Sequence, residues 1–284
     1  GEGQVWYNSS GADYKAGITV EAWSSGGAHP TANRHGFSAG TQTAAVYASG
    51  YVGPQPAPPA NLMLATSFEY DGSSWTSPAG AQRGEVEEYD GTSWTEQSDL
   101  PTGVQSGTGI GIQTAALSVS GGADTDITQE YDGSSWTAGG DIATGRTRGV
   151  GSGTQTAGMY SGGALGTSPY AVQTLVEQYD GTSWTALPAS LNTGQAAYTS
   201  TNVGTSSKNT TIVAGGTAGH PASVTGVTQI YDGSTWRTAP SMATARQTNL
   251  VGDSSAALAV AGGANITTVE EFAASKAVKV ITDS

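Results

Sequence analysis

Cysteine is absent from the 284 residues of this chain, which excludes disulfide bonds, zinc–thiolate sites, iron–sulfur clusters and thiol nucleophiles. Charge is also scarce: 12% of residues are charged, and 23 acidic against 10 basic residues give a formal net charge of −13. This balance disfavours nucleic acid as a partner, because like charges repel. No apolar run approaches the ~18 residues of a membrane helix, so no membrane insertion is expected.

Glycine is abundant instead, with 42 copies, about twice the usual share. A six-residue motif, Tyr-Asp-Gly-Ser/Thr-Ser/Thr-Trp, occurs five times along the chain. The copies occupy residues 70–75, 89–94, 131–136, 179–184 and 231–236. Most copies follow one another at intervals of about 40–50 residues, which is typical of β-propeller blades.

Each full unit is predicted to hold four short strands, which we call a to d. After Trp136, the pattern predicts strands at 149–152, 157–161 and 174–179, and a fourth that opens at Trp184. The Asp-Gly dipeptide between the last two strands is a strong hairpin signal, because Gly tolerates positive φ and Asp bonds to the local backbone. A Gly-Gly pair follows strand b in most units, as at 162–163.

The Gly-Gly pair followed by Tyr and Trp resembles the kelch-repeat (galactose-oxidase-like) β-propellers. The sequence of the repeats, Glu-Tyr-Asp-Gly-Thr-Ser-Trp-Thr with Thr-Gln-Thr-Ala-Ala, is similar to that of kelch-like repeat proteins of tailed, especially marine, phage virions. The fold expected is all-β: a propeller of about six four-stranded blades, one incomplete, with five or seven blades as alternatives. Residues 1–22 are expected to form an N-terminal strand or linker that helps ring closure, and residues 23–284 the propeller.

The repeat departs from its pattern in three places. The interval from Trp75 to Trp94 is too short for four strands and keeps only the c–d hairpin at 85–94. Residues 4–10 look like a further strand c with its turn. At the C-terminal end, Phe272-Ala273-Ala274 replaces Tyr-Asp-Gly and no Trp follows. We expect the two chain ends to meet, because an open sheet edge invites aggregation.

The recurring residues are expected to be structural. The Tyr and Trp rings are predicted to pack between neighbouring blades, with sugar stacking as the alternative. The Gly pairs allow close backbone approach, and the recurring Asp is expected to be a turn residue rather than a metal ligand. The predicted core residues are Tyr70, Trp75, Tyr89, Trp94, Tyr131, Trp136, Tyr179, Trp184, Tyr231 and Trp236.

The variable loops carry the candidate ligand site. In a four-stranded meander the a–b and c–d turns share one face, and the b–c and d–a loops share the other. The second face is irregular in sequence and holds many of the cationic residues, and function on rigid frames is usually carried by such loops. The alternative is that these arginines pair with acidic neighbours. The candidates are Arg34, His35, Tyr51, Arg146, Arg148, Tyr170, His220 and Arg246.

The sequence holds no convergent nucleophile, base or metal cluster, so catalysis, cofactors and metal sites are not expected. The copper chemistry of galactose oxidase needs a Tyr–Cys crosslink that cannot form here. The function expected is a non-enzymatic virion-associated protein of a tail, fibre or capsid surface, for host-surface or glycan recognition or for particle decoration. Its expected partners are other virion proteins and a host-surface glycan, and its expected location is virion or extracellular. The alternative is an extracellular polysaccharide-acting enzyme on a propeller scaffold.

Overall fold

The computed structural model describes residues 5–8, 13–26, 37–41, 44–48, 67–70, 75–76, 86–89, 94–98, 100–102, 104, 107–121, 124–166, 170–196, 208–218, 223–262 and 266–281. These residues form an all-β protein of several small antiparallel sheets, with one 3₁₀ turn, η1 (Lys208–Thr210).

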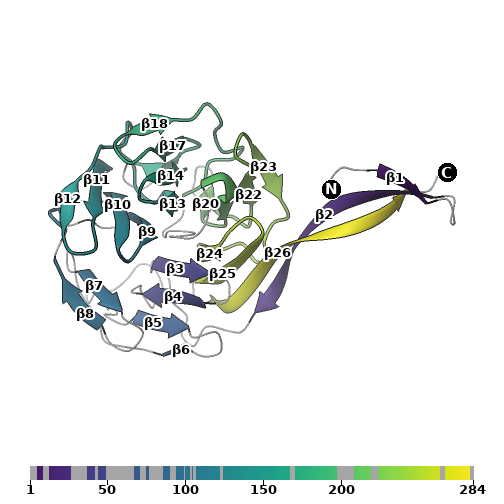
Figure 1. The fold of residues 1–284 in the computed structure, drawn as a ribbon, viewed down its shortest axis with the longest axis horizontal. Coiled ribbons are helices and arrows are strands. Elements are labelled where there is room, and N and C mark those ends of the chain that lie inside the picture. The colour runs from purple at the N-terminus through teal and green to yellow at the C-terminus, as the bar shows by residue number, and fades with distance from the viewer. Residues whose placement is uncertain are drawn as a thin grey trace.

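Six sheets follow one another along the chain and around a disc (Figure 1). The first sheet contains β3 (Phe37–Thr41), β4 (Ala44–Ala48), β5 (Ser67–Tyr70) and β6 (Trp75–Thr76). The second contains β7 (Val86–Tyr89) and β8 (Trp94–Gln97), and the third β9 (Thr108–Ile112), β10 (Ala115–Gly121), β11 (Thr125–Tyr131) and β12 (Trp136–Ala138). The fourth contains β13 (Val150–Thr154), β14 (Ala157–Ser161), β17 (Val176–Tyr179) and β18 (Trp184–Ala186).

The fifth sheet contains β19 (Ile212–Ala214), β22 (Thr228–Tyr231) and β23 (Trp236–Ala239). The sixth contains β24 (Asn249–Gly252), β25 (Ala256–Gly262), β26 (Ile266–Ile281), β2 (Asp13–Gly26) and β1 (Val5–Asn8). In Figure 1 the strands β3, β9, β13 and β24 lie toward the middle of the disc, and β6, β8, β12, β18 and β23 lie toward its rim. The neighbouring pairs β9–β13 and β24–β3 are in contact, so the sixth sheet lies beside the first.

The predicted strands and turns agree with the structure to within one or two residues where both are described. In the fourth sheet, β14 coincides with the strand predicted at 157–161, and β17 ends at Tyr179 as predicted. In the short interval before Trp94, the described residues after β6 form the hairpin β7–β8. Residues 4–10 differ from the expectation of a further strand c. They contain the strand β1, but β1 pairs with the start of β2 and not within a repeat unit.

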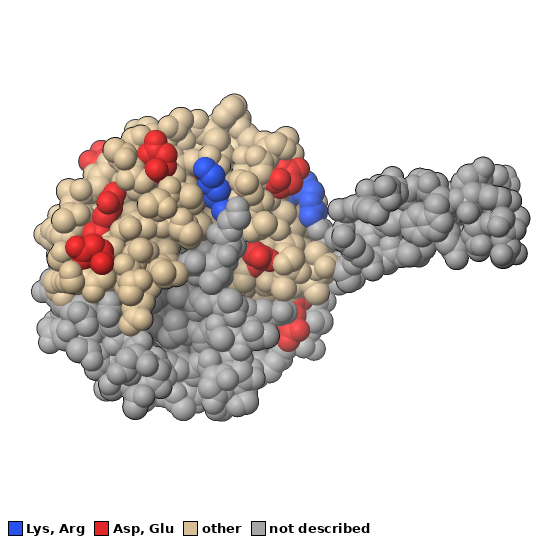
Figure 2. Space-filling model, in the orientation of Figure 1, with Lys and Arg blue, Asp and Glu red and all other residues tan. Residues whose placement is uncertain are grey.

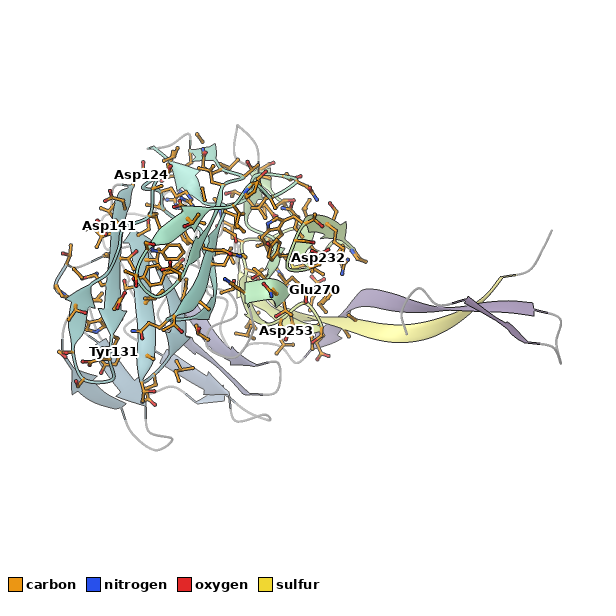
Figure 3. The ribbon with its side chains drawn as sticks, turned by 45° about the horizontal axis from the view of Figure 1, so that its top comes forward. Asp124, Tyr131, Asp141, Asp232, Asp253 and Glu270 are labelled. Atoms are coloured by element: carbon orange, nitrogen blue, oxygen red, sulfur yellow. The ribbon has the colours of Figure 1, made fainter. Side chains whose placement is uncertain are left out.

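The predicted grouping of loops on two faces is also seen in the third and fourth sheets. A Cβ atom at Gly133, in the turn after β11, would lie 3.3 Å from the Thr114 carbonyl oxygen in the turn after β9. In the fourth sheet, a Cβ atom at Gly181 would lie 3.5 Å from Cα of Thr156, in the turn after β13. Asp124 and Tyr131 lie at opposite ends of β11 in Figure 3, which separates the two faces.

The b–c connections of the fourth and fifth sheets contain short hairpins that the sequence did not predict. These are β15 (Ala164–Leu165) with β16 (Ala171–Val172), and β20 (Thr217–Ala218) with β21 (Ser223–Val224). Isolated bridges join Thr147 to Ala164 and Ala196 to Thr217. In each of these two sheets, the d–a loop that leads into the sheet is therefore joined by backbone hydrogen bonds to the b–c hairpin of that sheet, on the second face.

The N-terminal and C-terminal strands pair with each other. The register of β2 and β26 runs from Tyr14 opposite Ile281 to Gly26 opposite Val269, and it places Trp23 opposite Phe272. This pair matches Tyr131 opposite Trp136 in the third sheet. β2 therefore supplies the outer strand of the sixth sheet, and it also spans the expected boundary between residues 22 and 23.

β2 and β26 continue beyond the disc as a long arm (Figure 1). β26 leaves β25 after Ala273, which pairs with Ala256, and then runs to Ile281 beside β2 alone. β1 adds four residues at the far end of the arm, opposite residues Asp13 to Ala16 of β2. We call β1 with the distal parts of β2 and β26 the arm.

The core lies between neighbouring sheets. Trp184, from the fourth sheet, packs in one cluster with Ile110 and Leu117 of the third sheet and with Tyr160 and Tyr179 of its own. Trp236, from the fifth sheet, packs with Met159 and Val176 of the fourth. The prediction of packing between units is confirmed for these two rings, which are 9% and 7% exposed.

Candidate functional site

Four of the eight candidate ligand residues have described positions: Arg146, Arg148, Tyr170 and Arg246. The other four, Arg34, His35, Tyr51 and His220, lie outside the described residues. Of the ten predicted core residues, Tyr70, Trp75, Tyr89 and Trp94 are placed in strands by their backbone only. Tyr131, Tyr179 and Tyr231 are buried, and each ring lies against the Trp that follows it in the hairpin.

Arg146 is completely buried in the loop between β12 and β13. Its Nη1 donates to Oε1 of Glu177 on β17 at 2.5 Å and to the Thr144 carbonyl at 2.9 Å. Nε donates to the Gly162 carbonyl at 2.8 Å, and the guanidinium carbon lies 4.6 Å from the centre of the Tyr160 ring. A guanidinium enclosed in this way has no surface left for an external ligand.

Arg246 repeats the arrangement in the loop between β23 and β24. It is completely buried, and its Nη2 lies 3.2 Å from Oε1 of Glu270 on β26. The same nitrogen donates to the Ala259 carbonyl at 3.2 Å. Burial lowers the pKa of Arg246, and the Glu270 carboxylate opposes that shift.

A neutral version of the pair occupies the fifth sheet. Gln195 lies in the loop before β19, the loop position that Arg146 and Arg246 occupy before their own sheets. Gln229 on β22 occupies the strand position of Glu177 and Glu270. Gln229 Nε2 donates to Oε1 of Gln195, and Gln195 Nε2 donates to the carbonyls of Gly215 and Val227 at 2.7 and 3.0 Å. Both side chains are buried.

These three loop residues also bind the preceding sheet through their own carbonyl oxygens. Gly163 N donates to the Gln195 carbonyl, and Gly216 N to the Arg246 carbonyl, each at 2.8 Å. Ser120 Oγ donates to the Arg146 carbonyl. A Cβ atom at Gly162 would lie 2.4 Å from the Gln195 carbonyl oxygen, which explains the need for Gly at this approach.

We call Arg146, Gln195 and Arg246 the inter-sheet links, because each joins the sheet before its loop to the sheet after it. For the two arginines, the structure shows the alternative stated from the sequence, which was pairing with acidic neighbours. The expectation that they contact a ligand is disfavoured by their burial. Their partners Glu177, Glu270 and Gln229 were not predicted from the sequence.

Arg148 and Tyr170 are brought together at the surface of the second face. The guanidinium carbon of Arg148 lies 3.6 Å from the centre of the Tyr170 ring, and both residues are half-buried. Among the candidates with described positions, this pair alone keeps side-chain surface open to an external molecule. It is the candidate ligand site.

The recurring aspartates act as turn residues. Asp132 Oδ1 accepts hydrogen bonds from the backbone N–H groups of Ser134 and Ser135 at 2.9 and 2.8 Å. Asp180 and Asp232 make the same contacts in the fourth and fifth sheets. In the part of the chain that the structure describes, no cluster of three His, Asp or Glu side chains could hold a metal ion.

These turns predict a loss of stability in acid. The backbone N–H groups of Ser135 and Ser134 hold the pKa of Asp132 at about 2, and similar bonds lower the pKa of Asp180 and Asp232. A lowered folded-state pKa stabilises the fold fully above the unfolded value near 4, and this stabilisation is lost as pH falls through the folded value. We expect the melting temperature to fall between about pH 4 and pH 2.

The test is thermal unfolding across this range for the parent chain and for a variant with all three aspartates changed to Asn, which keeps an acceptor oxygen but does not titrate. The triple variant should show a flatter pH profile. Asp126→Asn, at an exposed position on β11, is the control. Equal slopes in the parent and triple variant would show that the turns do not set the acid sensitivity.

Charge is dispersed over the described surface. On the face shown in Figure 2, charged side chains are scattered, and most of the described surface is neither acidic nor basic. Among the described residues on this face, no field of a single sign marks a binding area.

No model of a known protein family and no curated protein sequence matches this chain. A search of the described residues for a helix long and apolar enough to cross a membrane finds none.

Proposed function

We propose that this chain is a kelch-like β-propeller of six blades, with the hairpin β7–β8 as the incomplete one. Three features support this proposal: the order of the six sheets around the disc, the central position of the first strands, and the shared sixth sheet of the two chain ends. The repeated Tyr–Trp hairpins and the inter-sheet links are the contacts that hold such blades together.

We further propose that the protein is a non-enzymatic module displayed on a virion, with the disc as its head and the arm as its attachment. The arm is the observation that carries this proposal. A ribbon of two strands is marginally stable at best by itself in water. The extension of β2 and β26 away from the disc therefore favours an arm that is covered by other virion proteins in an assembly.

This attachment leaves the second face of the disc available for recognition or decoration. Its b–c hairpins and d–a loops are tied together by backbone bridges, so they present a preorganised surface. The alternative, an enzyme acting on extracellular polysaccharide, would need acid and base groups converging on a cleft. In the described loops of the second face, Asp124 and Asp141 each accept a backbone N–H group and the Arg146–Glu177 pair is buried, which disfavours this alternative.

The binding proposal is tested by incubating the purified chain with a panel of bacterial surface polysaccharides and measuring both retention and the release of reducing ends. We expect retention of at least one polysaccharide without release of reducing ends. Steady release that scales with protein concentration would contradict the non-enzymatic proposal and support the alternative. Bovine serum albumin, an acidic protein with no expected recognition role, serves as the control for non-specific retention.

A further inference from the structure

The second sheet has an inner strand edge without a described partner. In the other five sheets, the strand in the place of β7 pairs on its inner side with a strand b, as β11 pairs with β10 and β17 with β14. In the part of the chain that the structure describes, β7 pairs with β8 alone. Backbone N–H and C=O groups on such an edge can pair with a strand of another chain.

The arm has a second edge of this kind. β26 pairs with β25 as far as Ala273, and Ala274 N donates to the Ser255 carbonyl at 2.9 Å. Beyond this point we call residues 275–281 the distal segment of β26, and its one partner among the described strands is β2. The distal segment is longer than β7, which has four residues, so it can pair along the whole of β7.

The two edges carry opposite charge. From residue 86 to residue 97, every charged residue of the hairpin β7–β8 is acidic: Glu87, Glu88, Asp90 and Glu96. The distal segment of β26 contains Lys276 and Lys279 and no acidic residue. Lysine on an exposed edge opposes pairing with an arbitrary strand, whereas opposite charges on paired strands stabilise each other. The distal segment therefore fits an acidic edge.

We propose that the distal segment of β26 in one copy of the chain pairs with β7 in a second copy, and adds the strand that the second sheet lacks beside β7. The arm extends away from its own disc, so the partner edge belongs to another copy (Figure 1). This inference rests on the proposal that the arm is covered in an assembly, and it names one partner of the arm. The opposite side of the arm, with β1, stays available to other virion proteins.

An antiparallel register, as in the described strand pairs, matches the two edges. A register that sets Val86 opposite Val280 also sets Glu87 opposite Lys279 and Glu88 diagonal to Lys276. Pairing of two distal segments would bring lysines toward lysines, and pairing of two β7 edges would bring glutamates toward glutamates, which is unfavourable. The contact therefore joins two different surfaces, and copies assemble head to tail.

The test measures self-association of the full chain by sedimentation equilibrium at low salt, where we expect the parent to associate reversibly. Two charge-reversed variants are compared with it: Lys276→Glu/Lys279→Glu in the arm and Glu87→Lys/Glu88→Lys in β7. Each variant alone should associate about tenfold more weakly or less, because like charges then face each other across the contact. An equimolar mixture of the two variants should associate as the parent does, because each arm then meets an edge of opposite charge.

Lys208→Glu/Arg237→Glu makes the same change of net charge on the disc as the arm variant, so it is the matched control and should associate as the parent does. Melting temperatures show whether each variant is folded. Variants with Gln at the same arm or β7 positions cover the case in which a reversed variant is not, and they should weaken association by a smaller factor. The inference fails if the parent stays monomeric, if either reversal leaves association unchanged, or if the mixture does not restore it. None of these failures affects the proposal that the arm attaches the disc to a virion, which is tested on particles.

Discussion

Arg146→Gln and Glu177→Gln are each expected to lower the free energy of unfolding by about 3–5 kcal/mol, because each leaves an uncompensated charge in a buried site. Arg146 has no solvent-exposed surface in the folded protein, and Glu177 is 2% exposed. Glu177 also accepts the Ala143 N–H at 2.8 Å, so the pair fixes the loop as well as the two side chains. Urea unfolding of the parent and the two variants measures the loss.

The double variant Arg146→Gln/Glu177→Gln should recover much of that loss. It recreates in the fourth sheet the neutral pair that Gln195 and Gln229 already form in the fifth. Arg237→Gln, at an exposed position, is the control and should change stability by no more than about 0.5 kcal/mol. Losses in the two single variants that simply add in the double variant would show that the pair is not coupled, and the inter-sheet link would lose its physical basis.

Trp184→Ala is expected to cost about 3–5 kcal/mol, because it removes a buried ring that fills the space between the third and fourth sheets. The indole also donates from Nε1 to Thr128 Oγ1 of the third sheet at 2.9 Å. The variant therefore removes both the packing and a hydrogen bond across the sheets. Chemical denaturation followed by circular dichroism measures the change.

Two further variants separate these contributions. Thr128→Val removes the acceptor but leaves the ring in place, and it should cost about 1–3 kcal/mol, because the indole N–H is left unpaired in a buried site. Trp136→Ala should cost less than Trp184→Ala, because Trp136 is only half-buried, although the repeat pattern placed both rings in the predicted core. Parent-like unfolding of Trp184→Ala would contradict the assignment of this ring to the core.

The strands and turns were predictable because their signals are local. An Asp-Gly dipeptide between two β-prone segments specifies its own hairpin, and the Asp132 turn shows the mechanism in the two backbone hydrogen bonds to its carboxylate. The division of loops between two faces followed from the alternation of a meander. The hairpins β15–β16 and β20–β21 were missed because two-residue strands leave no periodic pattern.

The positions of Arg146 and Arg246 were not predictable from loop membership, because a loop assignment does not say whether a side chain points outward or inward. A signal did exist in the repeats. Glu177 and Glu270 stand two residues before Tyr179 and Phe272, and each occurs in a unit whose loop carries Arg. The unit with Gln195 has Gln229 at that place. Matched changes at two repeat positions indicate contact, and comparing the units with one another would have found it.

The arm was missed although its cause is visible at Phe272. Where the other units place Asp-Gly, this unit has Ala273-Ala274, and without the turn the strand has no local reason to reverse. β26 therefore runs on without a turn to a total length of 16 residues and takes β2 as its partner. How far such a strand continues depends on its partner strand at the other end of the chain, which no local pattern encodes.

We propose that this protein is a disc displayed from a virion by its arm, and immunogold electron microscopy of purified phage particles is the experiment that tests this proposal. Two antibodies are used, one raised against a peptide of residues 217–224, which contains β20 and β21, and one against the β26 segment of the arm. We expect the first antibody to label intact particles at their periphery, and the second to label them only after the particles are dissociated. Labelling of intact particles by the arm antibody alone, or no labelling of particles by either, would contradict it.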